Sequence, residues 1–531
     1  MTASAHIDRF VIDHLPPADQ QPTLIFNDDT AYPERMNAAT ELLRRAIAAA
    51  GPEATALIDF DHQWGWGRLD AISNRMARVL VEDMGLVPGN RVLLHGPNSA
   101  WTVMAWFAIL KAGGVVVATM PMLRAAELAT VIDKAQVTHA LVYVAFTDVV
   151  AEAQGLGSTL VQVMDSATLQ PTCMTKPVTF DAVDTAAEDP ALIAFTSGTT
   201  GKPKGCVHFH RDVLAMADTF ARHVVKLTKD DIVVGTPPIA FTFGLGGLVV
   251  FPAAVGAATA FPDRPGFDAL AETIAARRAT ALVTAPTGYR ALLKLDGQHD
   301  LSSLRTCVSA GEALPAATSD AWHTATGVRI IDGIGSTEMI HVFISSSGAD
   351  IRPGATGKVV PGYEACIVDE AGDMLPPGET GRLAVRGPTG CRYLDDPRQT
   401  AYVRNGWNLT GDIYRQDADG YFWFVARADD MIVSSGYNIG APEVENALLT
   451  HPAVAEAAVV GAPDEERGQI VRAFVVLNPG HAPDDVLRTA LQDHVKAVIA
   501  PYKYPRALEF VNALPRTSTG KIQRFRLKAD T

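Results

Sequence analysis

Short apolar runs alternate with helical stretches along most of the chain. Residues 91–96 (RVLLHG) predict a buried strand, residues 101–111 (WTVMAWFAILK) a largely buried helix, and residues 114–119 (GVVVAT) a second strand. Strands separated by helices are typical of parallel sheets. The chain shows no fixed-period repeat and no low-complexity tract, which excludes solenoids and propellers. The predicted fold class is therefore α/β.

Later strands run directly into polar loops. ALIAF precedes TSGTTGKPKG, RTCVS precedes AGEALP, and VRIID precedes GIGSTE. Because ligands of open α/β sheets bind beyond the carboxyl ends of the strands, we expect these loops to converge on one site. The most apolar region, residues 233–261, is broken by prolines and glycines, and it predicts buried strands and turns instead of a membrane-spanning helix.

The pattern changes over roughly the last hundred residues. A helix is predicted at residues 442–449, strands at 455–461 and 471–477, and a second helix from about residue 483, which together indicate a small α+β domain. The charged stretch at residues 427–430 is typical of a connector. We therefore expect a large N-terminal domain over residues 1–428 and a small C-terminal domain over residues 429–531.

Composition narrows the function classes. With 48% hydrophobic and 20% charged residues, the chain is expected to fold throughout its 531 residues. A net charge of -14 disfavours nucleic acid and anionic membranes as partners. The five cysteines lack CxxC spacing, and the N-terminus lacks the basic start and apolar run of a secretory signal. These features predict a cytoplasmic protein with reduced thiols.

The sequence TSGTTGKPKG, at residues 196–205, predicts a phosphate-binding loop. Its glycines let backbone N–H groups face phosphate oxygens, while its hydroxyls and lysines add donors and charge. Pro203 follows Lys202 where a Walker A loop requires Ser or Thr, which disfavours a P-loop NTPase. A flexible surface turn is disfavoured by a strand before the loop and an amphipathic helix after it, whose apolar face carries Val213, Ala217, Phe220 and Val224. The predicted phosphate contacts are Thr196, Ser197, Gly198, Thr199, Thr200, Gly201, Lys202 and Lys204.

This loop resembles the signature of the acyl-adenylate-forming superfamily, which includes acyl-CoA synthetases, firefly luciferase and peptide-synthetase adenylation domains. The other core motifs follow in the family's order from about residue 65 onward. The resemblance implies a large N-terminal domain of stacked α/β sheets with a β-barrel-like part, followed by a small mobile C-terminal domain. It also implies ATP, Mg²⁺ and coenzyme A as cofactors or co-substrates.

The resemblance assigns the nucleotide site residue by residue. Two segments are implied to sandwich the adenine, Ala310-Gly311-Glu312 and Asp332-Gly333-Ile334-Gly335. Thr337 and Glu338 of GSTE are implied to contact phosphate and Mg²⁺, a cation that prefers hard oxygen ligands. Asp412 is implied to accept both ribose hydroxyls, since a carboxylate has two acceptor oxygens, and Arg427 also to reach the ribose.

Lys521 matches the family's catalytic lysine. It lies in PRTSTGKI, where a mobile ammonium would stabilise the negative charge that gathers as the carboxylate attacks the α-phosphate; without this context it would be an ordinary solvated lysine. Asp429 matches the hinge, with Ala426 where the family commonly has Gly. Gly436 and Tyr437 match the stretch that lines the pantetheine tunnel. Since no carrier domain follows Lys521, we expect free CoA to be the acceptor.

The acid is predicted from the loop at residues 238–244 (PIAFTFG). It lacks the aspartate with which peptide-synthetase adenylation domains bind an α-ammonium group, and its rings favour a flat or hydrophobic acid. STEMIHVF, FTFGLGG and the N-terminal HLPPADQ and YPERMNAATELL resemble the benzoate-CoA ligase group, in particular 2-aminobenzoate-CoA ligases. The implied aryl pocket contains Phe241, Thr242, Phe243, Ala310, Gly335, His341 and Val342. His341 either bonds a ring substituent or the carboxylate, or is satisfied by local backbone.

Other functions stay open at this point. A ligase for medium-chain fatty or other acids would share every motif, as would a luciferase-like monooxygenase that oxidises the adenylate. A non-catalytic acyl or nucleotide sensor would be expected to have lost Lys521 or Glu338, and both are present. The partners predicted are a small aromatic carboxylic acid, ATP and CoA, and a homodimer is open.

Overall fold

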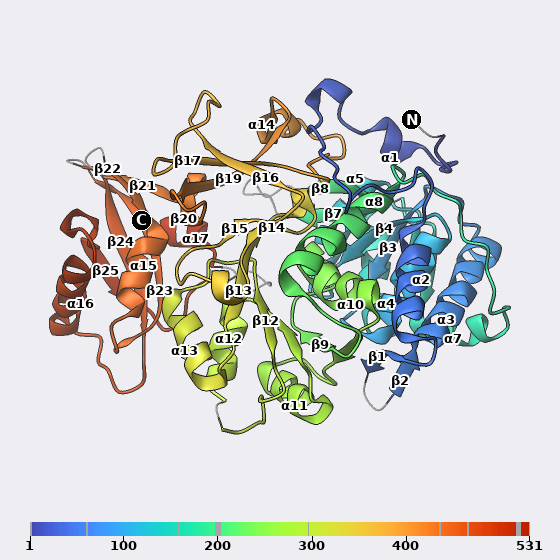
Figure 1. The fold of residues 1–531 in the computed structure, drawn as a ribbon, viewed down its shortest axis with the longest axis horizontal. Helices are drawn as coiled ribbons and strands as arrows, with labels where there is room; N and C mark the ends of the chain where they lie inside the picture. Colours follow the sequence, from blue (N-terminus) through green and yellow to red (C-terminus); the bar gives the residue numbers. More distant parts are fainter. Residues whose placement is uncertain are drawn as a thin grey trace.

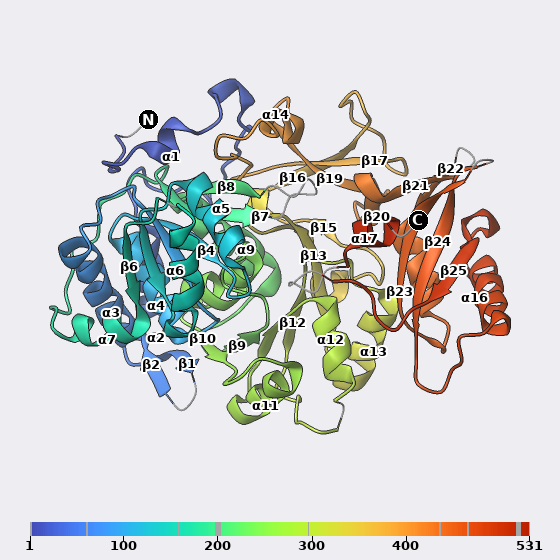
Figure 2. The ribbon, with the colours of Figure 1, turned by 180° about the vertical axis from the view of Figure 1, so that it is seen from behind.

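The structure is a computed structural model. It describes residues 3–59, 62–157, 159–196, 203–295, 297–434, 437–464, 467–516 and 522–529, with the backbone alone at Asp429, Asn438 and Ala529. Two large sheets with helices between and outside them form the body of the molecule, and the C-terminal elements form a smaller unit at one end (Figure 1). The view from behind shows the same arrangement, with α16 at the far edge of the smaller unit (Figure 2).

The first large sheet has six strands in the order β6-β5-β3-β4-β7-β8. All neighbours are parallel except β7 and β8, which are antiparallel. β3 and β4 are the strands predicted at residues 91–96 and 114–119, and every residue of β3 is buried, as expected for a parallel sheet covered on both faces. The strands are β3 (Arg91–His95), β4 (Val115–Thr119), β5 (His139–Val142), β6 (Gln162–Asp165), β7 (Pro190–Thr196) and β8 (Lys204–Phe209).

The second large sheet has nine strands in the order β15-β14-β13-β12-β11-β9-β10-β1-β2. From β13 to β1 the pairs are parallel, and antiparallel strands complete both edges. Its strands are β1 (Thr55–Asp59), β2 (His62–Gly65), β9 (Ile232–Gly235), β10 (Ala258–Phe261), β11 (Ala281–Val283), β12 (Thr306–Ser309), β13 (Ile330–Gly335), β14 (Val342–Ser345) and β15 (Lys358–Val359).

Helices occupy three layers around these sheets. The main core, which includes Trp106 of α4, Leu42 of α2 and Phe220, lies between the sheets. Helices α5 and α6 cover the outer face of the six-stranded sheet, and α11, α12 and α13 cover that of the nine-stranded sheet. The helices of this body are α1 (Phe10–Asp13), α2 (Ala38–Ala50), α3 (Trp66–Arg78), α4 (Ala100–Lys111), α5 (Ala125–Ala135), α6 (Thr147–Gly155), α7 (Ser166–Met174), α8 (His210–Met216), α9 (Thr242–Leu245), α10 (Phe251–Val255), α11 (Phe267–Arg277), α12 (Pro286–Leu293) and α13 (Ala316–Thr326).

The remaining elements form a barrel-like sheet and the small domain. The barrel-like sheet contains β16 (Glu364–Val368), β17 (Thr380–Arg386), β18 (Val403–Arg404), β19 (Trp407–Gln416) and β20 (Phe422–Arg427), beside α14 (Gln399–Tyr402). The small domain contains β21 (Met431–Ser434), β22 (Tyr437–Gly440), β23 (Val454–Asp464), β24 (Gly468–Leu477), β25 (Ala507–Phe510), α15 (Ala441–Leu449), α16 (Asp485–Val498) and α17 (Arg524–Ala529), with a core of its own. The predicted fold class is confirmed, while the boundary after residue 428 stays a prediction.

The prediction for residues 233–261 is correct at both ends, where β9 and β10 are buried strands, and wrong between them. Between β9 and β10 the chain forms α9, a π-helical turn at Gly246–Val250, and α10 instead of strands and turns. Pro252 follows the π-helical turn without a break in the helical backbone, and the Leu248 carbonyl four residues earlier accepts a hydrogen bond from the Thr259 hydroxyl at 2.9 Å in place of the missing N–H. Within the described residues, no helix is long and apolar enough to cross a membrane.

Two segments next to the motifs also differ from the prediction. Strand β8 follows residues 196–203 directly, so the predicted amphipathic helix begins only at His210, although its apolar face is buried as expected. β13 continues through Gly335, so Gly333, Ile334 and Gly335 lie on a strand and not in a loop. The pairing of β13 with β14 extends this strand beyond the apolar run that predicted it.

Candidate active site

The ends of two strands from different sheets meet at the candidate site. Thr196, the last residue of β7, pairs directly with Lys204, the first residue of β8. β13 leads into a 3₁₀ turn at Thr337–Met339. Nε2 of His208, on β8, lies 2.7 Å from the carbonyl oxygen of Thr337. The hairpin that contains the predicted phosphate loop is thus hydrogen-bonded to the turn that carries Glu338.

Lys204 and Glu338 come together through Tyr393. The Tyr393 hydroxyl donates to Glu338 Oε1 at 2.6 Å and accepts from Lys204 Nζ at 2.8 Å. The Lys204 ammonium lies 3.6 Å from Glu338 Oε1 and 4.8 Å from the centre of the Tyr393 ring. Burial raises the pKa of the Tyr393 hydroxyl, and the Glu338 charge adds to this, so the tyrosine is the donor toward the carboxylate.

Residues between β17 and β19 hold the rest of the GSTE turn. The hydroxyls of Tyr402 and Ser336 lie 3.2 Å apart, and the Thr389 hydroxyl donates to the Met339 carbonyl at 2.9 Å. The next residue, Ile340, has a φ of 64°, in the region that β-branched residues rarely adopt. Such backbone strain persists where the surroundings over-determine the conformation. The turn is therefore held by the Tyr402 and Thr389 hydroxyls as well as by its own 3₁₀ hydrogen bonds.

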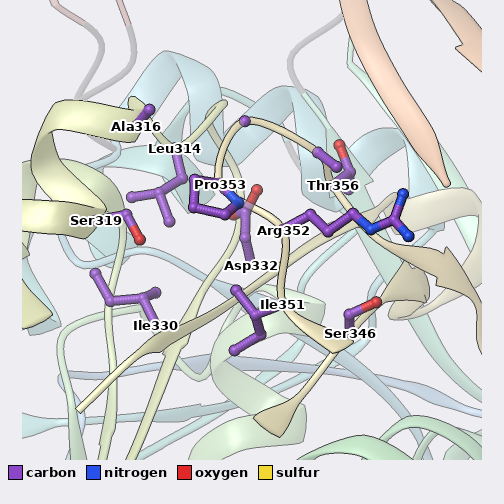
Figure 3. A pocket seen from close by; sticks show the side chains of 12 residues that line it. Leu314, Ala316, Ser319, Ile330, Asp332, Ser346, Ile351, Arg352, Pro353 and Thr356 are labelled. Atoms are coloured by element: carbon purple, nitrogen blue, oxygen red, sulfur yellow. The ribbon is translucent and has the colours of Figure 1, made fainter. Parts of the chain in front are cut away.

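Asp332 lies at a pocket between β13 and the loop at residues 351–356. The carboxylate is on the floor of this pocket, with Leu314, Ser319 and Ile330 to one side and Arg352 and Thr356 to the other (Figure 3). Its Oδ1 is buried and has no hydrogen-bond partner among the described residues. Burial raises the pKa of the Asp332 carboxyl to about 7. An unpaired buried acceptor is ready to receive a donor from a ligand.

Asp412 and Arg427 form a pair on adjacent strands. They are register partners on β19 and β20, and Arg427 Nη1 donates to Asp412 Oδ1 at 2.8 Å. Burial raises the pKa of the Asp412 carboxyl although the Arg427 guanidinium opposes this. Gly411 has a φ of 77°, and a Cβ there would lie 3.2 Å from the guanidinium. Glycine is thus favoured at position 411 because its φ is positive and because a side chain there would crowd the Arg427 guanidinium.

The Glu312 loop faces the small domain. The Thr287 hydroxyl donates to Glu312 Oε2 at 3.2 Å, and Arg290 donates to the same hydroxyl. Burial lowers the pKa of Arg290, opposed by the charges of Glu312 and of Glu456 in the small domain. Arg516 pairs with Glu456 at 2.7 Å and also acts on Arg290. The segment that ends at Arg516 therefore lies close to the loop predicted to hold the adenine.

His341 lies buried among three aromatic rings. Its ring stacks on Phe220 with centroids 5.4 Å apart and contacts Phe251 at 4.6 Å and Phe243 at 5.8 Å. Burial lowers its pKa to about 3, so the imidazole is neutral. Neither ring nitrogen makes a well-formed hydrogen bond to a described residue. The backbone of Phe243 nevertheless interacts with the imidazole and opposes the fall in its pKa, so both alternatives for His341 stay predictions.

The other predicted aryl residues lie around this ring and in a second cavity. Val342 pairs with Gly335, where a Cβ would lie 2.6 Å from the His341 carbonyl oxygen. Phe241 and Thr242 line a cavity between α9, β4 and β7, whose wall is largely apolar. Ala310 is buried in the main core. The described contacts thus join Phe243 with His341, while Phe241 and Thr242 share a separate hollow.

Several predicted residues lie outside the described part of the chain: Ser197, Gly198, Thr199, Thr200, Gly201, Lys202, Gly436 and Lys521. Of the predicted CoA residues, Tyr437 is described; it is 56% exposed and its ring lies 4.7 Å from that of Tyr502. Asp429 lies in a 3₁₀ turn at Ala428–Asp430, between β20 and β21. This turn is the place at which the predicted hinge would act.

The site suits a cation that is shared with phosphate. In the described ranges, no three His, Cys, Asp or Glu side chains gather as a metal cage. Mg²⁺ commonly binds through one or two carboxylates together with substrate phosphates. The buried Glu338 carboxylate at the end of β13 fits this mode, because it provides hard oxygen ligands beside the predicted phosphate loop.

Comparison with known proteins identifies the family. The description "AMP-binding enzyme" matches residues 44–392, and "AMP-binding enzyme C-terminal domain" matches residues 443–521. The chain belongs to the AMP-binding enzyme family. Benzoate–CoA ligase of Thauera aromatica is 36% identical over 508 residues, which cover 94% of this chain and 96% of the relative. This confirms the resemblance on which the motif assignments rest.

Solved structures of AMP-binding enzymes superpose on the whole molecule. An anthranilate CoA ligase, AuaEII, in complex with anthranoyl-AMP gives a TM-score of 0.91 at 36% identity and covers 95% of this chain and 99% of its own. A benzoate CoA ligase from Burkholderia xenovorans LB400 gives 0.85 at 33% identity, with 93% and 100% covered. These relatives place the chain among AMP-forming acyl-CoA synthetases, whose co-substrates are ATP and CoA.

Some residues of this AMP-binding enzyme were not predicted from its sequence. Tyr393, Tyr402 and Thr389 contact the GSTE turn from a segment without a recognised motif. His208 was passed over because the residues after the phosphate loop were expected to be helical. The short run Cys206–Phe209, which contains Val207 and Phe209 and is buried throughout, was the available signal for β8.

Proposed function

We propose that this AMP-binding enzyme is an aryl acid:CoA ligase that acts on benzoate or 2-aminobenzoate. It forms aryl-AMP and pyrophosphate from the acid and ATP, and then aryl-CoA and AMP. The observation that carries the proposal is the aromatic wall around the neutral His341, three residues beyond Glu338 in the chain. Flat rings stack well on such a wall.

The proposed residue roles come from the family resemblance, and the contacts of Lys204, Glu338, Asp332 and Asp412 support them. Thr196, Lys204 and the rest of the phosphate loop would hold the triphosphate, with Thr337 beside it. Glu338 would share Mg²⁺ with the phosphates, and the cation would neutralise their charge. The adenine would lie between the Ala310–Glu312 and Asp332–Gly335 segments, and Asp412 with Arg427 would bind the ribose.

The small domain supplies the remaining roles in this proposal. Lys521 would stabilise the charge that develops as the acid attacks the α-phosphate. Rotation about Asp429, between residues 1–428 and 429–531, would then bring Gly436 and Tyr437 to the pantetheine arm of CoA. The cytoplasm, which contains ATP and CoA, is the proposed location, and a homodimer stays a prediction.

His341 supports an aryl acid with an amino group beside the carboxylate. A neutral imidazole has one nitrogen that accepts a hydrogen bond and one that donates. Because its buried nitrogens make no well-formed hydrogen bond to a described residue, such a bond would be worth more than it would be in water. An aromatic amine is a donor of suitable size, whereas the chain of a fatty acid offers none.

The test is ATP- and CoA-dependent AMP release with benzoate, 2-aminobenzoate, fluorobenzoates, cinnamate and octanoate. We expect kcat/KM for the best benzoate to exceed that for octanoate by at least about tenfold, which corresponds to about 1.4 kcal/mol. If octanoate is preferred, the aryl assignment is wrong and the chain is a fatty acid:CoA ligase. Oxygen uptake without CoA would indicate a luciferase-like enzyme, and binding without turnover a sensor.

A further inference from the structure

Lys204 and Glu338 are joined by a residue to which the proposed function gives no role. The Tyr393 hydroxyl lies between them, 2.8 Å from the ammonium and 2.6 Å from the carboxylate oxygen Oε1. The direct separation of the two charges is 3.6 Å, which is longer than the usual length of a charge-assisted hydrogen bond. The hydroxyl therefore acts as a spacer within a close ion pair.

Tyr393 is held rigidly enough to act in this way. It is 1% exposed, and its ring packs edge-on against Tyr402 with centroids 5.9 Å apart. Its backbone N–H donates to Gln399 Oε1 at 2.9 Å, and the amide group of Gln399 donates in turn to the Gln20 carbonyl at 2.9 Å. Tyr402 thus fixes the ring of Tyr393, and Gln399, which is held by the N-terminal segment, fixes its backbone.

Arg392, the residue before Tyr393, also bonds to the N-terminal segment. Nε of Arg392 donates to Gln21 Oε1 at 3.0 Å, and the backbone of Tyr393 pairs with that of Cys206 on β8. Because β8 also begins with Lys204, the tyrosine and the lysine belong to one paired unit. The hydroxyl can therefore hold a constant position relative to the ammonium while Glu338 approaches from β13.

We propose that Tyr393 is a positioning residue that keeps Glu338 and Lys204 separately available to Mg²⁺·ATP. Its hydroxyl orients the carboxylate through Oε1 and prevents the ammonium from closing on it. Without the hydroxyl, Lys204 and Glu338 pair directly and neutralise each other, so that the carboxylate is weakened as a Mg²⁺ ligand and the ammonium as a phosphate partner. This inference rests on the proposed role of Glu338.

The test is Tyr393→Phe, which removes the hydroxyl and keeps the ring. Calorimetric titration with Mg²⁺·ATP should show at least about tenfold weaker binding, the scale of one hydrogen bond to a charged group. In pyrophosphate exchange, half-saturating Mg²⁺ should rise by a similar factor, while the rate at saturating Mg²⁺·ATP changes less. Thioester formation from supplied aryl-adenylate and CoA should stay near the parent rate, which also shows that the variant is folded.

Tyr32→Phe is the matched control. The Tyr32 hydroxyl donates to Asp218 Oδ2 at 2.9 Å, and Arg45 donates to the other oxygen of that carboxylate at 2.7 Å. The control thus removes a hydroxyl from a tyrosine–carboxylate–cation group of the same chemistry, in a group to which the proposal assigns no ligand. We expect its Mg²⁺·ATP binding to match that of the parent.

The outcomes separate this inference from the function on which it rests. Parent-like Mg²⁺·ATP binding by Tyr393→Phe overturns the positioning role, as does an equal loss in Tyr32→Phe, which would indicate general destabilisation. Glu338→Gln is measured alongside. If that variant keeps the parent's Mg²⁺ dependence, the role proposed for Glu338 is wrong; if only Glu338→Gln is impaired, that role stands and the inference about Tyr393 is overturned.

Discussion

Asp332 should make ATP binding depend on pH. Its carboxyl has a pKa of about 7 because it is buried, and its Oδ1 has no partner among the described residues. In the proposed site the 6-amino group of adenine would donate to this oxygen, and a carboxylate accepts more strongly than a neutral acid. Adenine binding should therefore favour the ionised form of Asp332. Below pH 7 this carboxyl is mostly protonated in the free enzyme, so binding should release its proton.

The size of the effect follows from the fraction of Asp332 that is ionised. With a pKa of about 7, nearly all of the carboxyl is ionised at pH 8 and about one tenth at pH 6. If only the ionised form binds, Kd for Mg²⁺·ATP should rise up to about tenfold between these values. Asp332→Asn keeps an acceptor oxygen without titrating, so calorimetry on both proteins separates Asp332 from the titration of ATP itself.

Stability supplies an independent check on the same carboxyl. The unfolded carboxyl ionises near 3.8 and the native one near 7, so between these values the native state binds more protons than the unfolded state. The contribution of the Asp332 carboxyl to the free energy of unfolding is therefore largest below pH 3.8, falls as pH rises from 3.8 to 7, and is constant above pH 7. Asp332→Asn should unfold at a higher temperature than the parent at pH 8, with the difference shrinking toward pH 4. Identical pH profiles of Kd and unfolding temperature in both proteins would refute the reasoning.

Two further predictions concern the chemistry and the aryl wall. Lys521→Ala should lose adenylation by at least about 10²-fold but keep thioester formation from supplied aryl-adenylate, measured separately; equal losses would contradict the proposed alternation. Gly246→Ala would place a Cβ 2.4 Å from the His341 ring, so kcat/KM for benzoate should fall and the free energy of unfolding should decrease by about 1–3 kcal/mol. Gly155→Ala, which meets nothing within 4 Å, is its control, and unaltered kinetics in Gly246→Ala would show that the ring is not part of the acid site.

Much of the fold could be predicted because burial leaves a local pattern. β3 and α4 were predicted within about one residue, since both are apolar along almost their whole length. The wrong assignment between β9 and β10 has a local cause. The region around Gly246 is apolar but short in each element, and periodicity does not distinguish a broken buried helix from buried strands in such cases.

The candidate site was only partly predictable for a different reason. Residues such as Asp332, Glu338 and Asp412 belong to motifs whose spacing is local. Tyr393 contacts Glu338 from 55 positions away, and Gln399 contacts Gln20 across 379 positions. Contacts of this kind depend on how separate strands are brought together by the tertiary fold, and they leave no periodic trace in a single sequence.

Two carboxylates, Asp332 on β13 and Glu338 in the 3₁₀ turn that follows it, show how this enzyme divides stability from function. Glu338 has a tyrosine donor and a nearby ammonium within the protein, whereas Asp332, six positions earlier, has an oxygen without any described partner. A buried unpaired acceptor destabilises the free protein, and a hydrogen-bonded one does not. The difference is understandable if the nucleotide supplies the missing donor for Asp332, while the orientation of Glu338 must be fixed before the cation and the triphosphate arrive. An unsatisfied group on β13 and backbone strain at Ile340, just after the following turn, are thus expected where ligand binding, and not folding, completes the interactions.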